Sequence, residues 1–187
     1  MGNETIEIRW HGRGGQGAIT AAKIAASAAF ESGYEGVVMA PTFGTERRGA
    51  PVFTSLKLSR QKIYDLSPIM QPDILVILDY LLLAEPDVLR GLKPGGLIVV
   101  NTPKPPQAHA VEGMRVAAAD VTTLSASVGL PTGIVNSGII GSFAKASALL
   151  SIDLLARKIE EEFKGKKSRA NADAARLCYN NTIMGDK

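Results

Sequence analysis

Residues 6–17 of this 187-residue sequence read IEIRWHGRGGQG, and most of the fold can be worked out from them. The first half alternates apolar Ile6, Ile8 and Trp10 with charged Glu7 and Arg9, as a strand with one buried face does. The second half is a glycine-rich turn that leads into the alanine-rich residues 18–32. The order of strand, glycine turn and helix is typical of the first unit of an α/β domain.

The rest of the chain continues this alternation of strands and helices. Residues 52–59 alternate apolar and polar side chains, which predicts an antiparallel or edge strand with one wetter face. A helix is expected near residues 81–89 between two wholly apolar strands, and that pattern indicates a parallel sheet covered on both faces. The apolar strands are expected at residues 36–40, 74–78, 97–100 and 116–118.

Capping residues predict where several helices begin and end. Gly33 should end the first helix, and Asp120 and Ser151 should each begin a later one. Asn171 is the expected cap of the last helix, after a break at residues 165–167, and another helix is expected over residues 137–150. We therefore predict one domain over residues 1–187, a three-layer, Rossmann-like α/β fold with a mostly parallel or mixed sheet and helices on its faces.

Composition excludes several functional classes. Hydrophobic residues make up 45% of the chain and aromatics only 5%, a balance typical of α/β proteins. The net charge of +3 includes a local lysine cluster at Lys164, Lys166 and Lys167, which reads as a solvated helix end, so no nucleic-acid partner is expected. With no leader-like N-terminus and no apolar run near the roughly 18 residues of a membrane span, we expect a cytoplasmic protein.

Cys178 is the only cysteine in the sequence. A single thiol excludes an internal disulfide and any four-cysteine iron–sulfur or zinc site made by this chain alone. Any iron–sulfur chemistry must then belong to another chain.

The glycine-rich turn is the main candidate binding site. Its residues are Gly12, Arg13, Gly14, Gly15, Gln16 and Gly17. Glycines let backbone N–H groups approach an anion at the positive end of a helix, so a phosphate or pyrophosphate is the natural ligand. The same glycines also suit a tight turn and close helix packing, so a purely structural role stays open.

A dinucleotide-binding site of the usual kind would need one more residue. An acidic side chain should follow the second strand, about 20 residues past the glycines, to hold a ribose hydroxyl. Met39, Ala40 and Pro41 occupy that place, and Glu35 precedes the strand. This counts against a nicotinamide or flavin dehydrogenase.

Arg47 and Arg48 form a second candidate site in the loop after residues 36–40. Paired guanidinium groups beside glycines can bind phosphate or carboxylate with bidentate hydrogen bonds. The alternative is a surface loop in which Glu46 pairs with one arginine and contributes little. Because this loop leaves the same end of the sheet as the glycine turn, the ligand-binding interpretation gains weight.

No catalytic constellation and no metal-ligand spacing surrounds the two histidines, His11 and His109. Both are expected to be structural or exposed, although His11 directly precedes the glycine turn and could reach a ligand phosphate. Asp79 and Asn101 each end a strand, so they could face one crevice or serve as local caps.

At these residues the sequence resembles the gamma subunit of pyruvate, 2-oxoisovalerate and related 2-oxoacid:ferredoxin oxidoreductases. Residues 12–23 and 46–52, and the segment from Pro72 to Asn101, carry the resemblance. It implies oxidative decarboxylation of a 2-oxoacid to an acyl-CoA with ferredoxin as acceptor. It also implies a coenzyme A contact in which Gly14, Gly15, Gln16, Gly17 and Lys23 take part.

The resemblance also implies a division of labour. Thiamine diphosphate, Mg and iron–sulfur clusters would lie in the alpha, beta and delta (ferredoxin-like) subunits, and this chain would hold no catalytic residue. Arg13 resembles the pyruvate and branched-chain groups, but pyruvate, 2-oxoisovalerate and 2-oxoglutarate all stay open as substrates. A free-standing dinucleotide-binding oxidoreductase, a non-catalytic assembly module, and a homodimer of the isolated chain also remain alternatives.

Overall fold

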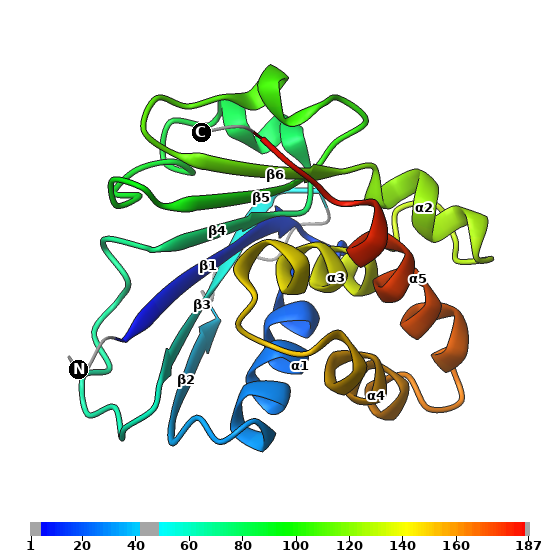
Figure 1. Ribbon diagram of the computed structural model, residues 1–187, viewed down its shortest axis with the longest axis horizontal. Helices are drawn as coiled ribbons and strands as arrows, with labels where there is room; N and C mark the ends of the chain where they lie inside the picture. The colour runs from blue at the N-terminus through cyan, green and yellow to red at the C-terminus, as the bar shows by residue number, and fades with distance from the viewer. Residues whose placement is uncertain (1–4, 42–48, 186–187) are drawn as a thin grey trace.

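Strand β1 (Ile6–Arg13) lies inside the sheet of the computed structural model, which describes residues 5–41 and 49–185 (Figure 1). Within those residues the sheet has seven strands in the order β2-β3-β1-β4-β5-β6-β7. Strands β1, β4, β5 and β6 run parallel, and β3 and β7 run antiparallel to their neighbours. The other strands are β2 (Gly36–Pro41), β3 (Pro51–Ser59), β4 (Ile74–Ile77), β5 (Leu97–Asn101), β6 (Arg115–Ala119) and β7 (Ile183–Met184).

The α/β class and the mixed sheet are as the sequence predicts. The alternation over residues 52–59 correctly indicates an antiparallel strand, but β3 is an internal strand between β2 and β1, and β2 takes the edge. Strand β7 was not expected, because it has only two residues and pairs with β6, from which four α-helices separate it in the sequence.

The α-helices gather on one face of the sheet, as Figure 1 shows. Helices α1 (Ala18–Glu31) and α3 (Asn136–Ser147) contact the strands, and α4 (Ile152–Glu162) and α5 (Ser168–Asn181) pack outside them. Trp10 of β1 and Phe143 of α3 are both fully buried there, with ring centroids 5.1 Å apart. Burying large aromatic surfaces in this way is a major source of stability.

Most of the expected caps are confirmed. Gly33 has a positive φ of 86° directly after α1. The carboxylate of Asp120 accepts a hydrogen bond from the N–H of Thr123 at 3.0 Å and caps α2 (Val121–Ser127), and Ser151 caps α4. The prediction for Asn171 was wrong. It lies buried within α5, where its amide donates to the carbonyl of Lys167 and its oxygen accepts from Ser137.

The second face of the sheet has a different cover. Leu75, Ile77, Ile98 and Val100 face the short 3-10 helix η1 (Tyr80–Ala84) and the turns after it. The helix predicted near residues 81–89 is confirmed only in its first part, as the 3-10 helix η1: the N–H of Glu85 bonds to the carbonyl of Leu82, and Pro86 has no N–H with which to continue. A second 3-10 helix, η2 (Pro106–His109), precedes β6.

The connections from the central strands place the candidate site. Helix α1 links β1 to β2 across one face, and the η1 segment links β4 to β5 across the other. Adjacent parallel strands whose connections leave on opposite faces form a crevice at their carboxyl ends, where open α/β sheets bind ligands. In this chain that crevice lies between the ends of β1 and β4.

Candidate functional site

The glycine-rich turn forms a closed loop between β1 and α1. The N–H of Gly14 donates to the carbonyl of Ala50 at 2.8 Å, and the N–H of Gly49 donates to Gly14 at 3.1 Å, so the loop prolongs the β1–β3 pairing. The side chain of Gln16 accepts from the N–H of Arg13 at 2.7 Å. These bonds hold the loop in one conformation.

The N-terminus of α1 presents donors without partners. Five backbone N–H groups there, those of Gly15 and of residues 17–20, donate to no acceptor among the described residues. The first turn carries no acidic side chain, and the helix dipole adds partial positive charge. An anion is the group that these N–H donors suit. We call the space beside them the glycine-loop hollow; its lining is Arg13, Gly14, Gly15, Gly17, Ala18, Ile19, Thr20 and Val52.

Two glycines of the loop are needed for different reasons. Gly15 has φ 95°, and a Cβ built on it would meet nothing within 4 Å, so its backbone faces open space. Gly17 has φ 81°, and a Cβ there would lie 2.9 Å from the side-chain nitrogen of Asn136, at the start of α3. Gly17 therefore allows helix packing, and Gly15 leaves room for a ligand.

Arg13 joins the ends of the two central strands. Its Nε donates to the Asp79 carboxylate at 2.7 Å, and its Nη1 donates to the carbonyl of Gly49 at 3.3 Å. Asp79 also accepts from the N–H of Leu81 at 3.0 Å, which caps η1. The guanidinium of Arg13 thus closes the crevice between β1 and β4, and its charge is already balanced by Asp79.

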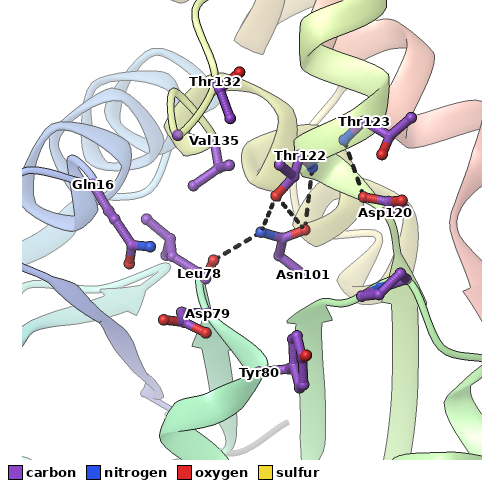
Figure 2. A pocket seen from close by; sticks show the side chains of 12 residues that line it. Gln16, Leu78, Asp79, Tyr80, Asn101, Asp120, Thr122, Thr123, Thr132 and Val135 are labelled. Atoms are coloured by element: carbon purple, nitrogen blue, oxygen red, sulfur yellow. Dashed lines mark hydrogen bonds between the residues drawn. The ribbon is translucent and has the colours of Figure 1, made fainter.

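A second space, which we call the polar crevice, is lined by the Asp79 partner of this ion pair; Figure 2 shows its side chains. Asp79 and Asn101 both line it, so they face one crevice and also act as local caps. The amide of Asn101 donates to the carbonyl of Leu78 at 2.9 Å and to the hydroxyl of Thr122 at 3.1 Å. Its lining also includes Gln16, Tyr80, Asp120, Thr122, Thr123, Thr132 and Val135.

Sequence reasoning missed part of this crevice. Asp120 was read only as a helix cap, and Thr122 and Thr132 were not considered, because they lie far from the glycine turn in sequence. The one available signal was that Asp120 follows a strand, at the end of the sheet where Asp79 and Asn101 also lie.

Lys23, the remaining predicted site residue that the structure describes, does not lie at the loop. Lys23 lies on α1 with its Nζ 3.0 Å from the carboxylate of Glu162, and it does not line the glycine-loop hollow. Arg47 and Arg48 lie outside the described residues. The described residues on either side of them, Pro41 at the end of β2 and Gly49 beside the glycine loop, are at the same end of the sheet.

His11 does not reach the glycine loop. It is buried on the second face of the sheet, where burial and, to a smaller extent, the charge of Arg9 lower its pKa to about 4.

Burial raises the pKa of the Cys178 thiol to about 12. In the part of the chain that the structure describes, no group of three or more His, Cys, Asp or Glu side chains could hold a metal ion, and no helix is long and apolar enough to span a membrane.

Comparison with known proteins agrees with this fold and shows the family. Residues 7–181 match the family described as pyruvate ferredoxin/flavodoxin oxidoreductase. The "Pyruvate/ketoisovalerate oxidoreductases common subunit gamma" of Thermococcus kodakarensis is 42% identical over 185 residues, which are 96% of this chain and 98% of that protein. The chain therefore belongs to the pyruvate ferredoxin/flavodoxin oxidoreductase family, as a protein of the gamma-subunit type.

Two solved structures have the same architecture. The pyruvate oxidoreductase subunit PORC of Thermotoga maritima is 28% identical with a TM-score of 0.84, over 98% of this chain and 99% of that chain. A 2-oxoglutarate:ferredoxin oxidoreductase from Magnetococcus marinus, with 2-oxoglutarate, coenzyme A and succinyl-CoA bound, is 19% identical with a TM-score of 0.73. That match covers 96% of this chain and 32% of the other chain, and it shows the fold alone.

Proposed function

We propose that this chain is the gamma subunit of a pyruvate or ketoisovalerate:ferredoxin oxidoreductase, in which the glycine-loop hollow forms part of the coenzyme A site. The main observation that supports this coenzyme A site is the set of N–H groups without an acceptor among the described residues, at the start of α1 and beside the crevice between β1 and β4. The family and the names of the similar proteins support the complex and its class of reaction.

The residues of the loop suit the phosphates of coenzyme A. The N–H groups of Gly15, Gly17 and the first turn of α1 would donate to phosphate oxygens, and the missing side chain at Gly15 leaves the approach open. Gln16 holds the turn, and Arg13 braces it against Asp79. Arg47 and Arg48, carried by the segment that returns from β2 to Gly49, would add positive charge toward the same phosphates.

The partner subunits would supply the redox chemistry. Thiamine diphosphate with Mg supports loss of carbon dioxide from the 2-oxoacid, the acyl group passes to the thiol of coenzyme A, and the released electrons pass through iron–sulfur clusters to ferredoxin. We assign these groups to the alpha, beta and delta subunits of a cytoplasmic complex, because the buried Cys178 thiol is a poor cluster ligand. The role of this chain is then to bind and orient coenzyme A and to contribute to assembly.

Anaerobic purification tests the complex. Affinity isolation of this chain from its native cells should bring with it chains that contain thiamine diphosphate and iron–sulfur clusters. Pyruvate- or ketoisovalerate-dependent reduction of an artificial acceptor should appear with those chains and be absent from this chain alone. Turnover by the purified chain alone would contradict the proposal.

Two tests separate this function from the alternatives. A free-standing dinucleotide enzyme would bind NAD or FAD, yet no acidic side chain ends β2 to hold a ribose, so calorimetry of the isolated chain should detect neither ligand at micromolar concentrations. An assembly module would need the glycines only for packing, and a substitution of Gly15, described in the Discussion, separates that role from coenzyme A binding.

A further inference from the structure

A third hollow lies on the second face of the sheet, away from the glycine loop. Residues of β1 and β3 form its floor, and the turns after η1 form its wall. We call it the second-face hollow; its lining is Arg9, His11, Pro51, Val52, Phe53, Leu82, Glu85, Asp87, Val88 and Arg90. Val52 lines both this hollow and the glycine-loop hollow, and none of the other lining residues takes part in the function proposed above.

Two polar side chains in the second-face hollow are buried without full hydrogen bonding. Arg9 and His11 are only 8% and 6% exposed. The Nη2 of Arg9 donates to the carbonyls of Val88 at 3.0 Å and Arg90 at 2.7 Å, but its Nε has no partner, and neither has the Nε2 of His11. Buried polar atoms of native proteins are nearly always paired, so two such side chains lining one hollow indicate a missing partner.

Among the described residues Arg9 also has no close ion pair, and a comparison with Lys57 on the same face makes this clear. Lys57, the other buried cation there, lies 3.5 Å from a Glu7 carboxylate oxygen and 3.2 Å from one of Asp65. Among the described residues Arg9 has no ion pair within 4 Å; Asp87 at the rim attracts its charge from farther away, and that carboxylate is itself paired with Arg90 at 2.8 Å. Burying a charge without an ion pair costs free energy, so an anion from outside the described residues would stabilise the buried guanidinium of Arg9.

The rest of the lining suits an apolar body attached to that anion. Val52, Leu82 and Val88 contribute apolar surface, and the His11 ring stacks on Phe53 with centroids 5.5 Å apart. Since burial and the Arg9 charge lower the pKa of His11 to about 4, the imidazole is neutral near pH 7 and can offer one N–H donor.

We propose that the second-face hollow binds a carboxylate carried on a small branched or aromatic apolar group, with Arg9 as its charge partner and His11 as a second hydrogen-bond donor. Both Nη2 hydrogens of Arg9 already donate to carbonyls, so a carboxylate would accept a charge-assisted hydrogen bond from the unpartnered Nε, and a desolvated site strengthens such a bond. The carboxylate has two sources of the same chemistry: a free organic acid, or an Asp or Glu side chain that a partner subunit inserts.

The first arm of the test uses the full-length isolated chain. Isovalerate and benzoate should bind saturably, and isovaleramide and benzamide, which have the same shapes without the charge, should bind about ten- to a hundredfold more weakly. Arg9→Gln should remove the preference for the acids. Lys62→Gln, which removes an exposed positive charge outside the hollow, should leave it unchanged.

His11 provides a readout that does not depend on any variant. A carboxylate bound beside it stabilises the imidazolium, so saturating isovalerate should raise the pKa of His11 in an NMR titration of the wild-type chain. His109 lies outside the hollow, and its pKa should not move. This readout keeps the proposal testable if Arg9→Gln fails to fold.

The second arm uses the complex assembled with its partner subunits. If the carboxylate is a free acid, isovalerate should still raise the pKa of His11 in the complex. If a partner supplies it, the free acids should no longer bind there, and Arg9→Gln should weaken assembly about tenfold or more relative to Lys62→Gln. Absence of acid binding by the isolated chain together with unchanged assembly of Arg9→Gln overturns the proposal.

Discussion

The two faces of strand β1 have opposite chemistry. On the helix-covered face Ile8 and Trp10 are fully buried among apolar side chains of α1 and α3. On the second face the alternate residues of the same strand are Arg9 and His11, which lie in a partly polar hollow under irregular turns. The larger apolar cluster thus lies on the helix-covered face, and the buried cation of β1 without an ion pair, Arg9, lies on the other.

The largest effect should come from the helix-covered face. Trp10→Ala should lower the free energy of unfolding by about 3–5 kcal/mol, because it removes a fully buried ring that packs against Phe143. Leu81→Ala, on the exposed side of η1, should cost less than about 1 kcal/mol. Urea unfolding of both variants measures the contrast, and equal losses would show that the two faces do not differ in this way.

Gly15→Val tests the end of the strand, where little stability is at stake. In the assembled complex the variant should raise the KM for coenzyme A about ten- to a hundredfold and leave the KM for the 2-oxoacid nearly unchanged, because a side chain would obstruct the N–H groups. Subunit stoichiometry must be checked, since φ 95° strains any other residue there. An unchanged KM for coenzyme A in a complete complex would favour the assembly module.

The buried His11 predicts a pH dependence of stability. Its folded-state pKa of about 4 lies below the unfolded value near 6.5, so between these pH values the unfolded chain takes up a proton that the folded chain does not. Stability from this group is present above about pH 6.5 and should fall by roughly 1 kcal/mol for each pH unit below about pH 6. Urea titrations at several pH values should show a shallower slope for His11→Gln than for wild type.

His109 is the natural control for that slope. Burial and the charge of Lys104 also lower its pKa, so it contributes in the same direction, but it lies near Thr102 on another part of the second face. Measuring His11→Gln in a His109→Gln background isolates the first group. An unchanged slope there would mean that His11 is solvated and free to take up a proton.

Lys23→Ala should have the smallest effect. The ion pair of Lys23 with Glu162 is exposed and worth less than about 1 kcal/mol, and its ammonium group is turned away from the glycine-loop hollow. We expect less than about a twofold change in the KM for coenzyme A, well below that of Gly15→Val. A tenfold increase would show that Lys23 leaves Glu162 for coenzyme A in the complex.

Local patterns in the sequence were enough for the strands and the loop. The alternation of β1, the continuous apolar runs of β4 and β5, and the glycines before α1 each reflect a physical requirement that neighbouring residues meet by themselves. The two long motifs around Gly12 and Arg47 also led to the family. These features depend on order along the chain, which the sequence contains directly.

Other features depended on contacts between distant segments, and only the tertiary structure decided them. The place of β3 inside the sheet, the pairing of Lys23 with Glu162 and of Arg13 with Asp79, and the burial of Asn171 each join residues far apart in sequence. The burial of Arg9 is a property of the same kind, because a charged residue on an alternating strand looks solvent-exposed until the fold buries it. Side-chain chemistry can be read from the sequence, but burial and partners follow from packing.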